Sequence, residues 1–199
     1  MLVMGILNVT PDSFADGGLH FDQARAIAHG IAMAKEGADI IDVGGESTRP
    51  GADRVSAEEE QARVIPVIRE LASQSIVISV DTMRASTAKL AIEAGATFVN
   101  DVSGGAADPE MFSTVAALDC RYILMHWRGH SKDMNAKAIY DDVVAEVIGE
   151  VSVQVEKALA AGIKRENIIL DPGIGFAKDA EHNWELLNRI DEFIALGYP

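Results

Sequence analysis

Cysteine is almost absent from this chain of 199 residues, in which Cys120 is the only one. A single cysteine cannot form a disulfide within the chain, so packing and hydrogen bonds must hold the fold together. Cys120 lies just before the apolar run Tyr122–Met125, which predicts a buried, unreactive thiol rather than a nucleophile. This usage of cysteine is typical of a protein from a reducing compartment.

Basic residues are scarce as well. The chain has 17 lysines and arginines against 31 aspartates and glutamates, which gives a formal net charge of −14. Proteins that bind nucleic acid normally present a basic surface, and anionic membranes attract basic segments. The charge balance therefore predicts that neither nucleic acid nor a membrane surface is a partner of this protein.

Long hydrophobic runs and a leader segment are also lacking. No apolar run approaches the roughly 18 residues of a membrane-spanning helix. The apolar stretch Met1–Val9 carries no positive charge, since Arg25 is the first basic residue, whereas secretory signal peptides begin with a charged region. Hydrophobic residues make up 48% and charged residues 24% of the chain, which is ordinary globular composition. We expect a folded, cytoplasmic protein.

What the sequence does contain is a regular alternation of two kinds of segment. Short apolar segments rich in β-branched residues predict strands at 3–9, 40–43, 76–80, 98–99, 122–125 and 168–170. Helical periodicity predicts helices at about 22–36, 57–73, 84–94, 109–118, 141–161 and 181–195. Glycines that favour helix ends follow four of these helices, at Gly37, Gly95, Gly162 and Gly197. Apolar strands that alternate with helices predict a parallel sheet covered by helices.

The predicted strands end in side chains that can form hydrogen bonds or ligate a metal. These are Asn8, Asp42, Asp81, Asn100, His126 and Asp171. An open parallel sheet gathers its ligands at one switch point, whereas a barrel recruits residues from the ends of many strands onto one face. Polar ends on all six strands therefore favour a (β/α) barrel.

Two loops and a set of strand ends have compositions that suggest binding. The polar segment Asn8–Gly18 is long for a strand-to-helix connection, and such loops are more typical of functional sites. The segment Gly44–Gly51 combines paired glycines, hydroxyls and Arg49, which suits an anion. Carboxylates and amides at several strand ends suit a heterocycle with several hydrogen-bond donors and acceptors, because buried polar groups must be paired.

Six segments of the chain resemble the motifs of dihydropteroate synthase, the enzyme of the folate pathway that sulfonamides inhibit. They are Met4–Phe14, Gly44–Gly51, Ser79–Thr82, Val99–Gly105, Leu124–His126 and Asp171–Phe176. They follow one another in the family's order over essentially the whole chain. The resemblance implies a (β/α)8 TIM barrel and a transferase that joins 6-hydroxymethyl-7,8-dihydropterin diphosphate to para-aminobenzoate. The products of that reaction are 7,8-dihydropteroate and diphosphate.

The resemblance also implies roles for individual residues. The positions that match pterin contacts are Asp81, Asn100, Val102, Met125 and Asp171. Asn8 and Thr48 match contacts to the diphosphate, and Asn8 also matches the residue associated with Mg²⁺. The positions that match the para-aminobenzoate pocket and two mobile loops are Phe14, Asp16, Arg49, Pro50 and Phe176. Asp16 and Asp81 are the candidate catalytic residues. An arylamine is a weak, neutral nucleophile, so a dissociative displacement of diphosphate is the expected mechanism.

The chain departs from the family at its C-terminal end. It stops at Pro199 after about six βα units, and the family's later Ser-Arg-Lys and Arg-x-His motifs do not occur. We therefore expect residues 1–199 to form a single pterin-binding barrel domain that is incomplete at its C-terminus, and the full-length form to be a homodimer. One alternative is a non-catalytic homologue that binds pterin. Another is a pterin-binding methyltransferase domain, which has no use for the loops Asn8–Phe14 and Glu46–Gly51.

Overall fold

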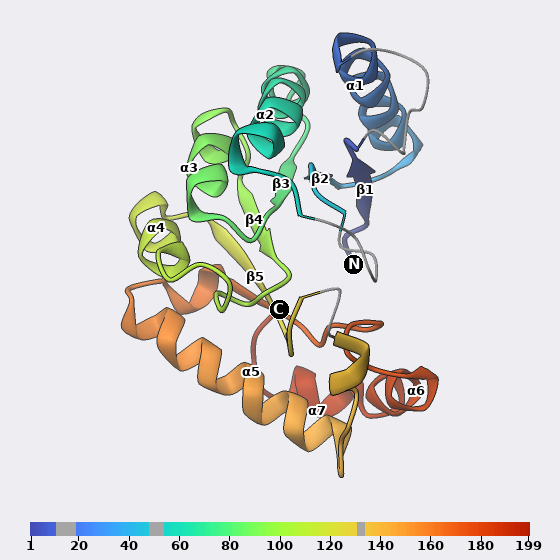
Figure 1. The fold of residues 1–199 in the computed structure, drawn as a ribbon, viewed down its shortest axis with the longest axis vertical. Coiled ribbons are helices and arrows are strands. Elements are labelled where there is room, and N and C mark those ends of the chain that lie inside the picture. The colour runs from blue at the N-terminus through green and yellow to red at the C-terminus, as the bar shows by residue number, and fades with distance from the viewer. Residues whose placement is uncertain (11–18, 48–53, 131–133) are drawn as a thin grey trace. The chain divides into compact units, whose positions relative to one another are not determined.

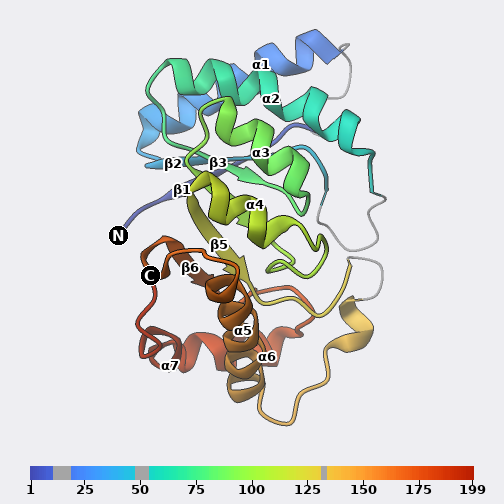
Figure 2. The same cartoon turned by 90° about the vertical axis from the view of Figure 1, so that its left-hand side faces the viewer.

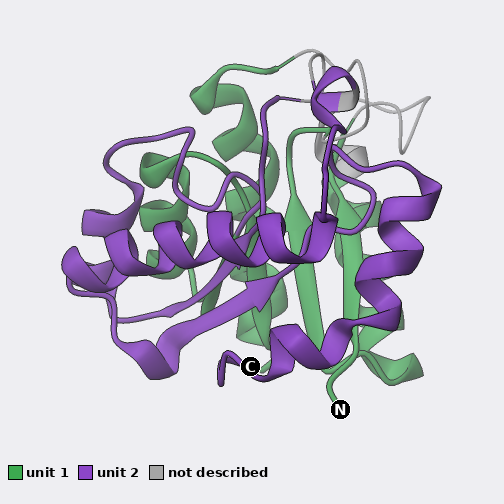
Figure 3. Ribbon diagram, turned by 90° about the horizontal axis from the view of Figure 1, so that it is seen from below, with its two compact units in different colours: residues 1–47, 53–100 green, residues 48–52, 101–199 purple. Residues whose placement is uncertain are grey.

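The computed structural model describes residues 1–10, 19–47, 54–130 and 134–199 (Figure 1). Contacts within the chain divide it into two compact units (Figure 3). Unit 1 comprises residues 1–47 and 53–100, and unit 2 comprises residues 48–52 and 101–199. Strands and helices alternate along both units, as the sequence predicts.

Unit 1 contains parallel strands with helices between them. Its elements are β1 (Met4–Asn8), α1 (Leu19–Glu36), β2 (Ile40–Gly44), α2 (Ala57–Ser73), β3 (Ile78–Asp81), α3 (Ala85–Glu93) and β4 (Phe98–Asp101), whose last residue belongs to unit 2. Each strand pairs in parallel with the next. The helices α1, α2 and α3 follow one another along one side of these strands (Figures 1 and 2). The predicted parallel arrangement is therefore confirmed within this unit.

The register of unit 1 places the ends of its four strands in one row. Asn8 lies opposite Gly44, Gly44 opposite Asp81, and Asp81 opposite Asn100. Because side chains alternate between the two faces of a strand, the neighbours in such a row point to the same face. Three of the polar strand ends that the sequence indicates, Asn8, Asp81 and Asn100, thus share one face and one edge.

Helix α2 contains a proline in its interior and compensates for it. Pro66 has no N–H, so the carbonyl of Ala62 one turn earlier loses its helical partner. The side-chain amide of Gln23 in α1 donates to that carbonyl at 3.0 Å. At its beginning, α2 is capped by Ser56, whose hydroxyl accepts from the backbone N–H of Glu59 at 3.2 Å. These contacts explain how a sequence with an internal proline keeps 17 residues helical.

Unit 2 continues the alternation. Its elements are α4 (Met111–Leu118), β5 (Arg121–Met125), the 3-10 helices η2 (Met134–Lys137) and η3 (Arg165–Asn167), α5 (Val143–Ala160), β6 (Ile168–Asp171), α6 (Ala180–Asn188) and α7 (Ile190–Ile194). Strands β5 and β6 are parallel, with Met125 opposite Asp171. The valines Val143, Val147, Val151 and Val155 recur at helical spacing in α5 and are buried, whereas Leu159 at the same spacing is 37% exposed.

The prediction of one helix over 181–195 is wrong, because the segment forms two helices that meet at Arg189. The backbone of Arg189 has φ −113° and ψ 26°, which interrupts the helix. Its guanidinium lies 3.0 Å from Asp142 Oδ1 and 2.7 Å from Glu192 Oε1. Leu186 and Phe193 are both buried, and their spacing of two helical turns fits one continuous helix equally well. Periodicity alone therefore could not reveal the break.

The structure bears on two predictions from the sequence, which concern the single cysteine and the membrane. Cys120 is buried, and this burial raises the pKa of its thiol to about 11. The thiol is therefore protonated at neutral pH, which confirms the prediction of an unreactive side chain. In the described part of the chain, no helix has both the length and the apolar character needed to cross a membrane.

Replacing Gly149 by alanine should stabilise the protein by about 0.5–1 kcal/mol, because glycine in a helix costs more backbone entropy than alanine. Gly149 lies within α5, where an added Cβ would meet no atom of the described residues within 4 Å. Urea unfolding would measure the change. The matched control is Gly162→Ala, which also has space but has φ +100° and should be destabilising. A midpoint for Gly149→Ala at or below that of the parent chain would contradict this prediction.

Candidate active site

The polar row of unit 1 brings together three of the residues singled out in the sequence. Asn8, Asp81 and Asn100 end strands β1, β3 and β4, with Gly44 between the first two. A Cβ on Gly44 would lie 3.3 Å from Asp81 Oδ2 and 3.5 Å from Asn8 Oδ1. The two side-chain oxygens therefore flank the space that the absent side chain of Gly44 leaves free.

This pair of oxygens has the chemistry of a partial site for a hard cation. Mg²⁺ prefers oxygen ligands and commonly takes only one or two from the protein, the rest coming from water and substrate phosphates. Among the described residues no group of three histidines, cysteines or acids could hold a metal by itself. Asn8 and Asp81 thus supply two oxygen donors of the type that a divalent cation takes.

Asp42, one layer below the row, orients Asn100. Asp42 is 2% exposed, and its Oδ2 accepts a hydrogen bond from Asn100 Nδ2 at 2.9 Å. With its nitrogen bound in this way, the Asn100 amide presents its carbonyl oxygen elsewhere as an acceptor. Burial raises the pKa of Asp42. The sequence indicates Asp42 as a polar strand end without a role of its own, and the signal for its role is an acid within a fully buried strand.

Glu46 joins the two flanks of the segment 48–53. Its Oε1 accepts from Arg54 Nε at 2.9 Å, and its Oε2 lies 2.8 Å from Arg84 Nη1 and accepts from the backbone N–H of Val55 at 3.3 Å. Glu46 precedes the segment and Arg54 follows it, so one carboxylate fixes both flanks. The side chain of Glu46 is only 8% exposed, which makes these charge-assisted contacts geometrically well defined.

In unit 2, the loop after β6 lies tightly against the end of β5. The backbone N–H of His126 donates to the carbonyl of Asp171 at 2.9 Å, and the N–H of Gly173 donates to Asp171 Oδ1 at 2.7 Å. Gly173 has φ +70°, and a Cβ there would lie 2.6 Å from the carbonyl oxygen of His126. The close approach of the loop to the carbonyl of His126 therefore requires glycine at position 173. Burial raises the pKa of the Asp171 carboxyl.

Of the remaining predicted residues of unit 2, Met125 and Phe176 lie near this loop. Met125 is buried and pairs in register with Asp171, while Val102 is 8% exposed in the turn after β4. Phe176 is half-buried, and its N–H donates to the carbonyl of Gly173 at 3.0 Å, which closes a turn. Unit 2 therefore brings Met125, Asp171 and Phe176 together on two neighbouring strands and one loop.

Lys178 is a buried cation that the sequence reasoning missed. Its side-chain nitrogen lies 3.0 Å from His126 Nδ1, and it donates to the carbonyls of Gly173 at 3.0 Å and Phe176 at 2.9 Å. An ammonium can only donate, so His126 accepts at Nδ1 and carries its proton on Nε2, 3.0 Å from Glu150 Oε2. Burial lowers the pKa of His126 to about 4, so the ring is neutral at pH 7.

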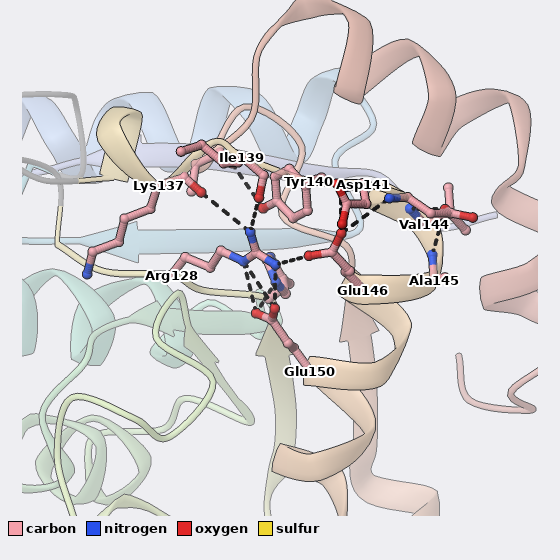
Figure 4. A network of polar contacts seen from close by, with 12 residues as sticks. Arg128, Lys137, Ile139, Tyr140, Asp141, Val144, Ala145, Glu146 and Glu150 are labelled. Carbon is pink, nitrogen blue, oxygen red and sulfur yellow. Dashed lines mark hydrogen bonds and ion pairs between the residues drawn. The ribbon is translucent and has the colours of Figure 1, made fainter.

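Arg128 holds the connection between β5 and α5 (Figure 4). Its guanidinium lies 2.7 Å from Glu146 Oε2 and 2.5 Å from Glu150 Oε1, and it is stacked 3.8 Å from the centre of the Tyr140 ring. It also donates to the carbonyl of Ile139 at 2.7 Å. Arg128 therefore fixes Glu150, the same carboxylate that contacts His126.

The predicted site residues thus fall into three groups. Unit 1 holds Asn8, Asp81 and Asn100, and unit 2 holds Val102, Met125, Asp171 and Phe176. The predicted residues that lie outside the described ranges are Phe14, Asp16, Thr48, Arg49 and Pro50. Asp101, another polar strand end, is instead structural: it is fully buried and accepts from Tyr122, Ser103 and Gly105.

Parallel strands that alternate with helices and end in carboxylates and amides are typical of the class of α/β enzymes, barrels among them, that bind polar ligands at their strand ends. The sequence profile of the family described as "pterin binding enzyme" matches residues 4–199. Over 198 residues the chain is 50% identical to the dihydropteroate synthase of Mycobacterium leprae, covering 99% of this chain and 70% of that enzyme. The chain therefore belongs to the pterin-binding enzyme family.

Solved structures agree with this assignment. A dihydropteroate synthase from Clostridium difficile in the presence of pteroic acid is 46% identical, with a TM-score of 0.92 over 100% of this chain and 74% of that one. The enzyme from Xanthomonas albilineans with 4-aminobenzoic acid is 45% identical, with a TM-score of 0.93 over 100% of this chain and 70% of that one. The predicted barrel-type fold and the predicted function, that of a transferase of the dihydropteroate synthase type, are confirmed.

Proposed function

We propose that the protein binds pterin diphosphate and joins it to para-aminobenzoate, giving 7,8-dihydropteroate and diphosphate. The observation that carries this proposal is the row of Asn8, Gly44, Asp81 and Asn100, which aligns oxygen-bearing side chains at the ends of neighbouring strands. The related enzymes with pteroic acid and with 4-aminobenzoic acid support it, because these two molecules contain the parts that the reaction joins.

The pterin ring is bound by acceptors and by apolar side chains. Asp81, Asn100 and Asp171 accept hydrogen bonds from its N–H groups, and Asp42 holds the Asn100 amide in the orientation that this requires. Val102 and Met125, both buried, pack against the ring. Pairing each N–H with an acceptor matters because an unpaired buried polar group costs about 1–3 kcal/mol.

The reaction breaks the C–O bond between the pterin methylene and the diphosphate, and it forms a C–N bond to the arylamine. Positive charge develops on the pterin as the bond breaks, and the carboxylates of Asp81 and Asp171 stabilise it. The amine nitrogen then attacks the methylene carbon and loses one proton. Asp81 and Asp16 are the proposed catalytic residues, and Asp16 lies outside the described residues.

Negative charge develops on the leaving diphosphate. Asn8 and Thr48 are the proposed diphosphate contacts, and Asn8 would hold Mg²⁺ together with Asp81, whose Oδ2 flanks the same space over Gly44. When bound, Mg²⁺ supplies charge stabilisation to the leaving group. The contribution of the chain is to keep these two oxygens at adjacent strand ends.

The arylamine is bound by Phe176 and by residues of the two loops. Phe176 ends the loop that begins at Asp171, so an acceptor for the pterin and an aromatic surface for the arylamine come from one segment. The other proposed contacts are Phe14, Arg49 and Pro50, of which Arg49 supplies a cation for the carboxylate of para-aminobenzoate.

The proposal also covers the domain, the oligomeric state and the partners of the protein. We expect residues 1–199 to belong to a single pterin-binding barrel domain and the protein to be a cytoplasmic homodimer. The net charge of −14 supports the expectation that it has no nucleic-acid or membrane partner. Gel filtration with light scattering would test the dimer.

An assay of diphosphate release tests the reaction. The protein should release diphosphate from pterin diphosphate only when para-aminobenzoate and Mg²⁺ are present, and titration calorimetry should detect binding of the pterin diphosphate. Binding without release would show a non-catalytic homologue. Methyl transfer from methyltetrahydrofolate to a cobalt acceptor, without diphosphate release, would instead show a methyltransferase.

Replacing Asn100 by alanine should raise the Kd for pterin diphosphate about 10- to 100-fold, because it removes one acceptor and leaves Asp42 without its donor. Asn167→Ala is the matched control, since Asn167 lies at the surface beside Asp119. Calorimetric titration of both variants measures the effect. Equal affinities in the two variants would contradict the placement of the pterin at Asn100.

A further inference from the structure

Lys178 lies two residues after Phe176 and is 8% exposed. Its ammonium has three acceptors, which are His126 Nδ1 and the carbonyls of Gly173 and Phe176. A lysine ammonium has three N–H donors, so each of its protons has a partner. A buried charge is tolerated where it is fully hydrogen-bonded in this way. No role was assigned to Lys178 from the sequence.

Two of the three contacts connect Lys178 with the loop 171–176, at Gly173 and at Phe176. Gly173 accepts from Lys178 through its carbonyl and donates through its N–H to Asp171 Oδ1 at 2.7 Å. Phe176 accepts from Lys178 through its own carbonyl at 2.9 Å. Movement of the ammonium would therefore affect the orientation of the Asp171 carboxylate and the position of Phe176 together.

His126 holds the third proton of Lys178, and its own position is fixed from the other side. The ring is 2% exposed, and Nε2 lies 3.0 Å from Glu150 Oε2. Glu150 is in turn held by Arg128 at 2.5 Å. His126 thus acts as a rigid acceptor for Lys178.

We propose that Lys178 is a positioning residue of the substrate site, whose ammonium fixes the loop that carries Asp171 and Phe176 while His126 fixes Lys178. This inference rests on the proposed function, in which Asp171 accepts hydrogen bonds from the pterin. Its positive charge also favours the ionised form of Asp171, which is the form that accepts. A neutral amine cannot serve the same three acceptors, because it has only two N–H donors.

The charge of Lys178 should therefore appear in the pH dependence of pterin binding. Burial lowers the pKa of Lys178 to about 8. The groups that face it are His126, Asp171, Glu150, Arg128 and, through the carbonyl of Ala177, Tyr140. The pKa of His126 is about 4 and that of Tyr140 about 12, both moved chiefly by burial. The pKa of Glu150 is lowered and that of Arg128 is raised, so neither of these two groups changes charge near pH 8, while burial raises the pKa of Asp171 and the charge of Lys178 opposes that rise. The pKa of about 8 therefore predicts that Lys178 changes charge between pH 7 and pH 9.

The experiment compares the parent protein with Lys178→Met and with Lys164→Met. Lys164 is an exposed lysine that pairs with Asp119, so its substitution controls for loss of one lysine. Titration of the ligand itself is controlled by Lys178→Met, in which a limb caused by the ligand would persist. Binding of pterin diphosphate is measured from pH 6.5 to pH 9.5 by calorimetry, and KM and kcat are measured for both substrates. The parent and Lys164→Met should lose affinity about tenfold per pH unit above pH 8. In Lys178→Met, Kd should be at least tenfold higher at pH 7 and should not rise further above pH 8.

Two results would overturn the proposal. One is a Lys178→Met variant with the affinity and pH profile of the parent. The other is a parent profile without a limb near pH 8, a result that does not depend on whether the variant folds. Failure of the proposed function is distinguishable from both, because the parent protein itself would then bind no pterin diphosphate at any pH.

Discussion

Replacing Glu60 by leucine should lower the free energy of unfolding by about 3–5 kcal/mol, the range for removing one partner of a buried ion pair. Glu60 is 1% exposed in α2. Its Oε1 accepts from Thr82 Oγ1 at 2.6 Å, and its Oε2 accepts from Thr87 Oγ1 at 3.0 Å and lies 2.6 Å from Arg84 Nη1. Leucine fills the volume but leaves two buried hydroxyls without their acceptor.

The substitution Glu60→Leu should also disturb the candidate site. Arg84 joins Glu60 to Glu46 and also donates to the carbonyl of Val55 at 2.5 Å. Losing Glu60 therefore loosens the contacts on the flanks of the segment 48–53 as well as those between α2, β3 and α3. Substrate affinity should fall in Glu60→Leu even at temperatures where the protein remains folded.

Urea unfolding measures the loss of stability, with Glu70→Leu as control. Glu70 lies in the same helix but is exposed, and a substitution at such a position usually changes stability by less than about 0.5 kcal/mol. Glu60→Gln keeps the shape and one acceptor oxygen, so its midpoint should lie between those of the parent and Glu60→Leu. Equal midpoints for Glu60→Leu and Glu70→Leu would refute the prediction.

The elements of this fold could be predicted because their signals are local. The apolar β-branched segment at 40–43 and the periodicity at 57–73 each reflect burial of neighbouring residues on one element, and both elements are observed. The polar strand ends could also be predicted to align, since strands of a parallel barrel begin and end together. The register of Asn8, Gly44, Asp81 and Asn100 agrees with this reasoning.

The residues that support the site could not be predicted in the same way. Lys178 contacts His126 across 52 positions of sequence, and Arg84 contacts Glu60 across 24. A lysine after a glycine-rich loop and a glutamate in an amphipathic helix both have the pattern of exposed residues. Their burial depends on partners that only the folded chain brings together, so a single sequence carries no local sign of it. The burial of Asp42 could be predicted in part, because a charged residue inside an apolar strand already indicates a buried contact.

Two glycines of the loop after β6, Gly173 and Gly175, should differ in how strongly a substitution by alanine destabilises the protein. Gly173 has φ +70° and Gly175 has φ +82°, so alanine at either position must adopt a left-handed conformation, which costs about 1–2 kcal/mol. Only at Gly173 would the added Cβ also meet backbone, 2.6 Å from the carbonyl oxygen of His126. At Gly175 it would meet no atom of the described chain within 4 Å. Relieving the clash should cost a further 1–3 kcal/mol, roughly the cost of overpacking.

Gly173→Ala should therefore lose about 2–5 kcal/mol of stability and Gly175→Ala about 1–2 kcal/mol. The difference should be larger still in binding, because Gly173 donates to Asp171 Oδ1 and accepts from Lys178. Displacing it disturbs the pterin acceptor and the cation that holds the loop, so Kd for pterin diphosphate should rise at least tenfold more in Gly173→Ala than in Gly175→Ala. Urea unfolding and calorimetric titration of the two variants measure both quantities. If the two variants bind equally well, the close packing of this loop on the end of β5 does not position the substrate.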